Sequence, residues 1–497
     1  MIQVPLTSKE KRLRNIKLFS LFVVIALPVF IHLGNLPMML WDEARYADSS
    51  YEMLHGGNPF VVTYFNQSDL LSTKPPLLHW VQSVSIALFG FNETAVRLPG
   101  AVACILVCIT FLFFTKKKLN SFSAGAIASL VFITTSEGIT GTDHSFRTAD
   151  YDALLTTFSF LGAVCFFLFT QDFKNNKYLV LTFVFFTLAV LTKAAAGLFY
   201  IPGLFIYALL QKTTTAFLKN KWFYILLAGS LVIVSFVFLL REHYSPGYLK
   251  ALNKMEFLGR HSTVHDGHNE PWWFYFDHLI NTGFGNWFVF ILGGWILALF
   301  TKNKLIRKYS LFSFIITFCF YSILISSKSK LAWYAIPLYP LFAMQAGIFL
   351  WIALTTIADF LSSKIKLNQM FVFYALVILI FIFPFKDSFC NSYGKNYNQG
   401  FIEYNNIQYY LQSKPEIVKH SILLANGEEK QQYLFYYYKL NDAGFNLKME
   451  FDLRDYKPGE RLIVNDTIAQ KNIEQNYRIK ILDSFNQLKT YCIEGSK

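Results

Sequence analysis

Charged residues are scarce in this chain, and that scarcity limits what the protein can be. Asp, Glu, Lys and Arg make up 15% of the 497 residues, whereas soluble proteins carry about 25%. Hydrophobic residues make up 54% and aromatic residues 18%, and the mean hydropathy is +0.35. This composition excludes an ordinary soluble protein and predicts a polytopic α-helical membrane protein.

Cysteine is also rare, and the six cysteines include no CxxC pair. Four of them lie inside apolar segments, which favours buried thiols. Cys390 and Cys492 lie in more polar sequence, and they could form a disulfide if the C-terminal tail is outside the cytoplasm.

The formal net charge of +13 raises the question of an anionic macromolecular partner. Lysine and arginine fall in short runs between apolar segments, which is where membrane topology places them. The charge pattern therefore argues against a nucleic-acid partner.

Eleven apolar segments come close to the ~20 residues that cross a bilayer. Basic residues precede the first of them, as in a signal peptide, but no small-x-small cleavage site follows, so an uncleaved anchor is expected. The predicted spans are at about 18–33, 96–115, 122–140, 152–170, 178–191, 196–210, 222–240, 284–300, 309–326, 333–353 and 369–385.

The basic residues between these spans predict the orientation. With a cytoplasmic N-terminus every inner loop is short and basic, as the positive-inside rule requires. The basic inner residues are Lys9 to Lys17, Lys116 to Lys118, Lys174, Lys177, Lys212, Lys219, Lys221, Lys302 to Lys308, Lys364 and Lys366. The outer side then receives the loops 34–95, 141–151, 192–195, 241–283 and 327–332 and the tail from about 386.

This orientation places the polar residues that need an explanation on the outer face. Lysines kept on the side that the positive-inside rule disfavours indicate an anionic ligand there, and we expect one polar cavity at the outer membrane surface. The residues are Asp42, Glu43, Asp143, His144, Asp150, Asp152, Glu242, His243, His261, His265 and His268, with Lys74, Lys193, Lys328 and Lys330.

The first outer loop, 34–95, contains Trp41-Asp42-Glu43-Ala44-Arg45-Tyr46 and then Lys74-Pro75-Pro76. An apolar stripe predicts a helix over 42–54, and the prolines begin a second apolar helix that runs to Phe89. Both helices carry charges or are short for a span, so they are expected to lie along the membrane interface.

Carboxylates, an arginine and a lysine beside the bilayer are costly to desolvate, so they indicate a site. Asp42 and Arg45 are three residues apart and would share one face of the predicted helix. The structural alternative is that Asp42 begins the helix and forms a local ion pair.

Short motifs follow one another in Trp41 to Met53, Thr73 to Leu77, Arg97 to Pro99, Arg147 to Leu155, Leu191 to Lys193 and Lys330 to Pro340. Together they resemble the bacterial protein-mannosyltransferase-like glycosyltransferases of the GT-C class, in particular the lipid A aminoarabinose transferases, over about residues 15–355. The resemblance implies an enzyme that transfers a sugar from a polyprenyl (undecaprenyl) phosphate carrier. The acceptor would be lipid A, a glycan or a protein on the outer face of the bacterial inner membrane.

The resemblance also implies roles for single residues. Asp42 matches the family's candidate catalytic carboxylate, whereas Arg45 and Lys74 match its phosphate-binding cations. Tyr334 matches a tyrosine that lines the phosphate site, and a tyrosine of the membrane-interface belt is the alternative. Such a transfer needs a base for the acceptor hydroxyl and cations for the phosphate, but no strong acid. The other substrate-binding candidates are Glu43, Arg147, Lys193 and Lys330.

Asp150 and Asp152 compete for the position of a second catalytic carboxylate, because the motif can be aligned in two ways. Asp150 is preferred and Asp152 is the second choice. Either residue could instead cap the helix that follows.

The sequence gives two conflicting indications about a metal site. Aminoarabinose transferases carry a Glu as a metal ligand where this chain has Thr73, which puts that site in doubt. His261, His265 and His268 have helical metal-ligand spacing and lie on the outer side, so they could bind a divalent metal such as zinc or magnesium. The same histidines could hold an acceptor or belong to a polar loop.

The tail, 386–497, is predicted to be a small extracytoplasmic α/β domain after a membrane domain at 1–385. Helices are expected at 401–411 and 430–440, and strands at 422–424, 461–464, 479–482 and 491–493. The tail contains no catalytic motif, so we expect it to cover the site or hold the acceptor.

A transporter or lipid flippase with an outer domain is the rival interpretation. Transporters usually show inverted repeats and polar residues at the membrane midplane, whereas here the polar groups gather on one face. A scaffold or sensor would need no cluster of Asp, Arg and Lys. The enzyme is therefore the preferred interpretation.

Overall fold

The computed structural model describes residues 8–39, 42–135, 139, 144–259, 270–392, 406–425 and 430–497. Trp41, Asp143, His261, His265 and His268 lie outside these ranges. The chain divides into two compact units, each described by itself below. The first contains Met1–Ile31, Asp69–Leu78 and Gly100–Ser392, and the second contains His32–Ser68, His79–Pro99 and Tyr393–Lys497.

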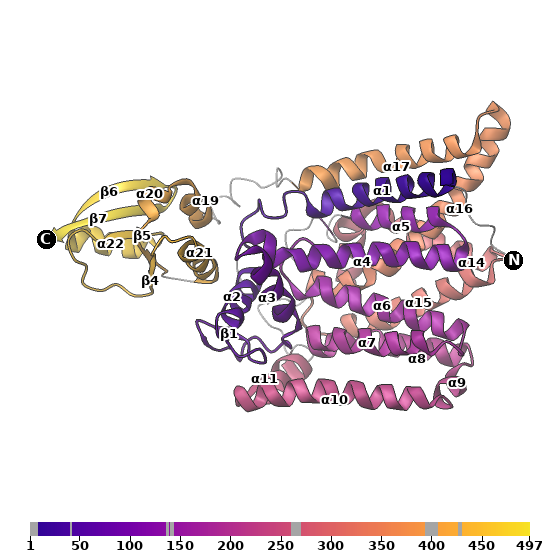
Figure 1. Ribbon diagram of the computed structural model, residues 1–497, viewed down its shortest axis with the longest axis horizontal. Helices are drawn as coiled ribbons and strands as arrows, with labels where there is room; N and C mark the ends of the chain where they lie inside the picture. The colour runs from indigo at the N-terminus through magenta and orange to yellow at the C-terminus, as the bar shows by residue number, and fades with distance from the viewer. Residues whose placement is uncertain are drawn as a thin grey trace. The chain divides into compact units, whose positions relative to one another are not determined.

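The first unit is helical, and its long helices are drawn in Figure 1. Its helices before the middle of the chain are α1 (Ser8–Phe30), most of α4 (Glu93–Leu119), α5 (Phe122–Ile133), α6 (Tyr151–Gln171), α7 (Asn176–Lys193), η1 (Ala194–Leu198), α8 (Ile201–Leu210), α9 (Thr214–Leu218), α10 (Lys221–Tyr244), α11 (Tyr248–Leu252) and η2 (Asn253–Gly259). Those after it are α13 (Phe274–His278), η3 (Leu279–Gly283), η4 (Gly285–Trp287), α14 (Phe288–Phe300), α15 (Lys304–Ser326), η5 (Ala332–Leu338), α16 (Tyr339–Ile365) and α17 (Gln369–Asn391).

Each of the predicted apolar segments overlaps one of these helices. Seven helical stretches are long and apolar enough to cross a membrane, and there are eight if the pair Phe274–Gly283 and Gly285–Phe300, bent by 111°, counts as one span. The remaining predicted segments overlap shorter apolar helices at Asn15–Phe30, Phe122–Ile133 and Ile201–Leu210. The many-spanning helical fold is thus confirmed, while the count of eleven stays a prediction.

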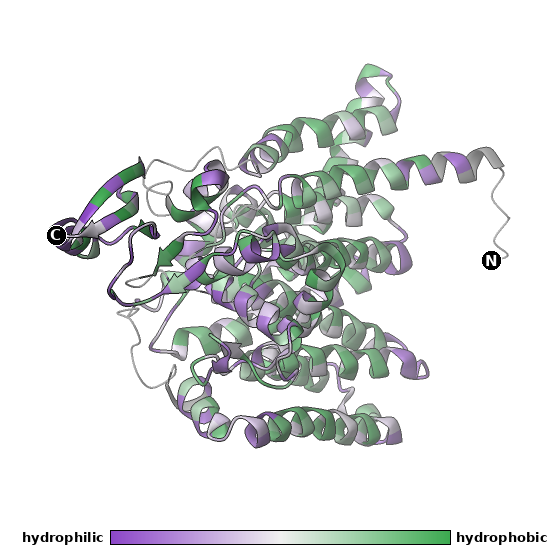
Figure 2. Cartoon of the chain, turned by 60° about the vertical axis from the view of Figure 1, so that its left-hand side comes forward, coloured by the Kyte–Doolittle hydropathy of each residue, from purple (hydrophilic) through white to green (hydrophobic). Residues whose placement is uncertain are grey.

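Asparagine starts several of these helices next to basic residues. Asn220, Asn303 and Asn368 accept backbone N–H hydrogen bonds at the beginnings of α10, α15 and α17. An asparagine at this position satisfies donors that the first helical turn leaves open. Figure 2 shows the helices mainly green along their length, with purple polar segments gathered at their ends.

Small residues let some helices of the first unit approach closely. A Cβ atom on Gly347 of α16 would lie 2.6 Å from Cα of Ala128 on α5, which is closer than atoms tolerate. Glycine at such a contact is a common basis of helix packing in membranes, where lipid gives little hydrophobic drive.

The second unit combines the helices of the predicted first outer loop with the tail. It contains α2 (Asp42–Leu54), β1 (Thr63–Tyr64), β2 (Gln67–Ser68) and most of α3 (Leu77–Phe89), so both predicted helices of the first outer loop are present. It is larger than the predicted tail domain because it includes these segments. Its later elements are α19 (Asn406–Ser413), α20 (Pro415–Val418), β3 (Ile422–Leu424), α21 (Lys430–Asp442), β4 (Lys448–Glu450), β5 (Arg461–Val464), α22 (Thr467–Asn476), β6 (Tyr477–Phe485) and β7 (Leu488–Ser496).

The tail forms a five-stranded mixed sheet in the order β4-β3-β5-β7-β6. Strand β3 is parallel to β4 and β5, whereas β7 is antiparallel to β5 and β6. Leu424, Leu462 and Tyr491 belong to the buried cluster under this sheet. The predicted α/β tail is confirmed, although β4 and α22 were missed. Cys390 on α17 and Cys492 on β7 are free thiols.

Candidate functional site

A pocket in the first unit has a polar part and apolar walls. Asp152, Lys193, Glu256, Ser327 and Tyr334 supply its polar groups. Its apolar wall is formed by Leu155, Ala195, Ala196, Phe199, Phe320, Ile323, Leu324 and Pro337. Such a lining suits a ligand with a polar head and an apolar chain.

Asp152 lies at the beginning of α6 and pairs with two cationic groups. Its Oδ1 atom accepts a hydrogen bond from Lys193 Nζ at 2.6 Å, and its Oδ2 atom lies 2.9 Å from His144 Nδ1. All three side chains are buried. Since the Lys193 ammonium also lies 5.3 Å from the centre of the Tyr334 ring, the structure brings three predicted site residues together.

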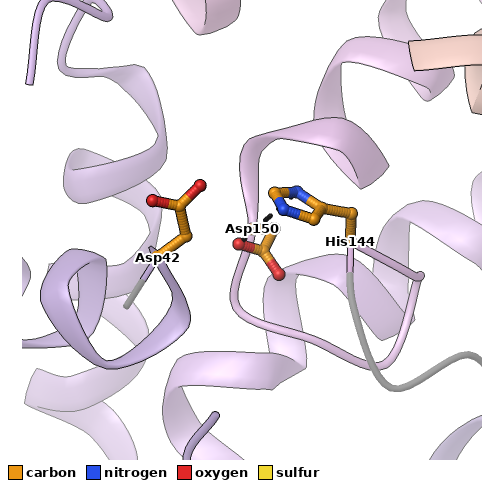
Figure 3. A group of neighbouring side chains, drawn as sticks. All are labelled: Asp42, His144 and Asp150. Atoms are coloured by element: carbon orange, nitrogen blue, oxygen red, sulfur yellow. Dashed lines mark ion pairs between the residues drawn. The ribbon is translucent and has the colours of Figure 1, made fainter. Parts of the chain in front are cut away.

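His144 lies between two carboxylates. Its Nδ1 atom is 3.8 Å from Asp150 Oδ1, the ion pair marked in Figure 3, and its ring stacks on Trp333 with centroids 4.2 Å apart. Burial alone would lower the pKa of His144, but the charges of Asp150 and Asp152 outweigh burial and raise the pKa above its usual value. The two carboxylates therefore shift the equilibrium of the imidazole toward its cationic form.

Asp150 occupies the N-cap position of α6, yet its side chain makes no capping hydrogen bond. The carboxylate is buried and faces His144. The geometry therefore does not support the helix-capping alternative for Asp150. Asp152 is held by its ion pairs with Lys193 and His144.

Lys193 ends α7, and the residue after it has an unusual backbone. Ala194 has φ 42°, in the left-handed region that residues other than glycine rarely adopt. This turn leads directly into η1, whose residues Ala195 and Ala196 line the pocket. The strained turn therefore places the Lys193 ammonium and part of the apolar wall at one location.

The loop before α3 is held by residues that the sequence analysis did not single out. Arg241, buried at the end of α10, donates to the backbone carbonyls of Ser72 and Lys74. Tyr248 donates its hydroxyl to the carbonyl of Thr73 at 3.1 Å, and burial raises the pKa of Tyr248 to about 12. The Lys74 ammonium lies 5.2 Å from the centre of the Tyr151 ring. Lys74 is therefore held at its backbone by Arg241 and at its ammonium by Tyr151.

Thr73 makes a contact that the sequence did not indicate. Its hydroxyl donates to Glu256 Oε1 at 2.9 Å, which brings a carboxylate from η2, the helix after α11, to the pocket. The two residues are 183 positions apart, and no motif surrounds Glu256. Arg241 likewise gave no signal beyond a charge at the end of an apolar span.

In the second unit, Asp42 to Arg45 of the first-loop motif form the first turn of α2. Asp42 begins the helix and is half-buried, and the Arg45 guanidinium lies over the Tyr64 ring at 4.7 Å. Glu43 is buried in a bidentate pair with Arg97, whose Nε and Nη2 atoms each lie 2.8 Å from a carboxylate oxygen. Arg97 also donates to backbone carbonyls of Leu33, Leu36 and Pro37.

These contacts bear on two predicted substrate-binding residues. Glu43 and Arg97 form a buried pair that fastens α2 to the chain before it. Arg147 donates to the carbonyls of Pro28, Val29 and Ile31 at the end of α1. Substrate binding by Glu43 and Arg147 stays a prediction, and the geometry gives both an anchoring role.

Lys330 is buried in the turn before η5. Within the part of the chain that the structure describes, no carboxylate lies within ion-pair distance of it. The histidines at 261, 265 and 268 lie outside the described residues, so a metal site there stays a prediction.

Comparison with known proteins identifies the class. The family described as dolichyl-phosphate-mannose-protein mannosyltransferase matches residues 73–239. The fold is similar to that of ArnT from Cupriavidus metallidurans bound to undecaprenyl phosphate, with a TM-score of 0.67, 17% identity, and coverage of 96% of this chain and 98% of that one. The chain is therefore a multi-pass membrane protein with the GT-C fold.

Relatives found by sequence comparison give a more specific similarity. The undecaprenyl phosphate-α-4-amino-4-deoxy-L-arabinose arabinosyl transferase of Wigglesworthia glossinidia brevipalpis is 26% identical over 67% of this chain and 58% of its own length. That of Pseudomonas savastanoi pv. phaseolicola is 26% identical over 52% and 48%. The chain thus spans about half the length of these relatives. It is similar to the aminoarabinose transferases, which confirms the resemblance predicted from its motifs.

Proposed function

We propose that this protein is a glycosyltransferase that moves a sugar from a polyprenyl phosphate carrier to an acceptor at the outer face of the inner membrane. The observation that carries the proposal is the pocket of the first unit, where Lys193, Asp152 and Tyr334 meet apolar walls. A polyprenyl-phosphate sugar has the matching division into a polar head and an apolar chain. The names of the relatives and the undecaprenyl phosphate bound to ArnT support this donor.

Lys74 and Lys330 are the proposed phosphate-binding cations. The backbone around Lys74 is pinned by Arg241 and Tyr248, so the ammonium would reach the phosphate with little loss of freedom. Lys330 is buried without a carboxylate partner among the described residues, and a buried cation of this kind is stabilised by an anionic ligand. Arg45 keeps its proposed role as a further phosphate ligand.

Asp42 is the proposed base. It would take the proton of the acceptor hydroxyl while that oxygen bonds to the anomeric carbon, and the bond from this carbon to the phosphate oxygen breaks. The carrier leaves as a phosphate monoester that the lysines stabilise. Asp152 is less suited to this task because Lys193 and His144 already occupy its oxygens. Its proposed task is to position both cations, and Asp150 is the alternative base.

The proposed orientation places the N-terminus in the cytoplasm and the tail in the periplasm, following the lysine distribution. Lipid A, a surface glycan and a protein remain the proposed acceptor classes. A transporter is less well supported, because the relatives are named as transferases.

The proposal is tested with the purified full chain in nanodiscs. Binding of undecaprenyl phosphate is measured first, and transfer from undecaprenyl-phosphate aminoarabinose to lipid A is then followed by mass spectrometry. Saturable binding with transfer is the expected result. Mass spectrometry of lipid A and surface glycans from cells with and without the gene identifies the natural acceptor. Absence of saturable binding by the folded protein would overturn the proposed function.

A further inference from the structure

Glu256 is a carboxylate of the pocket that the proposed reaction does not use. It lies on η2 and lines the pocket with Asp152, Lys193 and Tyr334. Its Oε1 atom accepts the hydroxyl hydrogen of Thr73 at 2.9 Å, and its side chain is half-buried. Thr73 therefore fixes the position of the carboxylate and leaves lone pairs for another donor.

Within the described part of the chain, the lining of the pocket contains no cation left over to balance the charge of Glu256. Asp152 and Lys193 form an ion pair at 2.6 Å, so each cancels the other. Among the described residues no cation lies within ion-pair distance of Glu256. The ionisable residues of the lining therefore sum to one negative charge, and the apolar walls keep that charge poorly screened.

Glu256 contacts the loop that carries Lys74. Thr73 holds Glu256 through its side chain, and the next residue carries the ammonium proposed to bind phosphate. Arg241 and Tyr248 fix the backbone of the same loop by donating to carbonyls at 72, 73 and 74. In the donor, the sugar is bonded directly to the phosphate, so neighbouring protein groups would contact the two parts.

We propose that Glu256 binds the sugar of the donor and selects its charge. The carboxylate accepts hydrogen bonds from hydroxyl or ammonium groups of the sugar, so that the pocket favours neutral and amino sugars and disfavours acidic ones. This inference rests on the proposed function, because it assumes a polyprenyl-phosphate sugar as donor.

The test compares wild type with Glu256→Gln, which keeps the shape and an acceptor oxygen but removes the charge. Equilibrium binding in nanodiscs is measured for undecaprenyl phosphate alone and for undecaprenyl phosphates that carry 4-amino-4-deoxyarabinose, glucose or glucuronic acid. Loss of a charge-assisted contact weakens binding by about 10- to 100-fold, so the variant should lose that factor for the amino sugar. Its affinity for the glucose donor should fall by a smaller factor, and it should bind the glucuronyl donor more tightly than wild type does. Binding of bare undecaprenyl phosphate should be unchanged.

Two further variants make the comparison specific. Thr73→Val removes the hydroxyl that holds Glu256 and should shift the same sugar preferences by a smaller factor. Asp277→Asn removes an exposed carboxylate of α13, outside the pocket, and should change none of the affinities.

An equal loss for bare undecaprenyl phosphate and for its sugar conjugates in Glu256→Gln would overturn the inference, since Glu256 would then only hold the loop. Unchanged sugar preferences would overturn it as well. Failure of wild type to bind undecaprenyl phosphate would overturn the proposed function and, with it, this inference. The two failures are therefore distinguishable.

Discussion

The ammonium of Lys193 lies 2.6 Å from the carboxylate of Asp152, and both side chains are buried. The pair joins the end of α7 to the beginning of α6, and these two helices pack against each other. A buried ion pair holds its partners in place, but it adds little stability beyond what well-packed apolar groups would give. Its retention beside a pocket therefore points to positioning of Lys193 and His144.

Breaking this pair on one side should destabilise the protein more than removing it entirely. Asp152→Asn leaves the Lys193 ammonium buried without its carboxylate, which costs about 3–5 kcal/mol. Lys193→Met leaves Asp152 with His144 as its remaining partner and should cost less. The double variant removes both members of the pair and leaves His144 beside Asp150, so its loss should be smaller than the sum of the single losses. Thermal unfolding of the four proteins in nanodiscs measures this difference. Strictly additive losses of stability would mean that the pair does not couple the two helices. All three variants are expected to have lost transfer activity.

Substitutions of Asp42 and Lys74 should reduce sugar transfer for different reasons. Asp42→Asn keeps the shape of the side chain but cannot take a proton, so turnover should fall by about 10²–10⁴-fold while undecaprenyl phosphate still binds. Lys74→Ala should weaken binding of undecaprenyl phosphate by about 2–3 kcal/mol, the scale of a charge-assisted contact. Single-turnover transfer and equilibrium binding separate the two effects. Near-normal transfer by Asp42→Asn would move the base to Asp150, and unchanged affinity in Lys74→Ala would refute its phosphate role.

The topology is testable by labelling. Single cysteines replace Lys117, Lys219, Lys304 and Lys364 on the expected cytoplasmic side, and Lys74 and a tail residue such as Lys457 on the outer side, in a cysteine-free background. An impermeant thiol reagent added to intact spheroplasts should label the outer positions only, because lysine-rich loops stay in the cytoplasm. Permeabilised cells provide the control in which all exposed cysteines react. Labelling of the tail only after permeabilisation would contradict the proposed orientation.

Local features were predictable from the sequence. The helix 42–54 and the strands Ile422–Leu424 and Arg461–Val464 have the predicted bounds, because apolar periodicity and turn residues mark them locally. Strand β4 was missed because Lys448–Glu450 is a short, polar edge strand whose pairing depends on β3. Helix α22 was missed because its sequence is mainly polar, although Asp466 caps it.

The candidate site was only partly predictable for a different reason. Motifs indicated Asp152, Lys193 and Tyr334, but their contacts depend on how α6, α7 and η5 pack. Arg241 donates hydrogen bonds to backbone carbonyls about 170 residues away in the sequence. Every residue has a backbone carbonyl, so the sequence does not indicate which ones accept these bonds. Glu256 reaches the pocket through a similarly long-range hydrogen bond, so no local pattern could have found it.

Asp48 in α2 predicts a pH dependence of stability. Its carboxylate is fully buried, and neither oxygen has a hydrogen-bond partner among the residues that the structure describes. Burial raises its pKa well above the usual value, the charge of Glu52 raises it further, and Arg45 opposes the shift. Tyr438 of α21 donates to Glu52 at 2.9 Å, so the two acidic residues lie where α2 meets the tail within the second unit.

The sign of this effect follows from proton linkage. The folded protein keeps the Asp48 proton at pH values where the unfolded chain, with a pKa of about 3.9, has released it. The stability that Asp48 contributes is therefore full below the unfolded pKa and is lost as the pH rises through the folded pKa. Asp48→Asn, which is neutral at every pH, should unfold at a higher temperature than wild type at pH 8 and should show a flatter stability profile between pH 5 and 8. Asp277→Asn is the exposed control and should follow wild type. A lower unfolding temperature for Asp48→Asn at pH 8 would show that the ionised carboxylate is stabilised in the folded protein, contrary to the raised pKa.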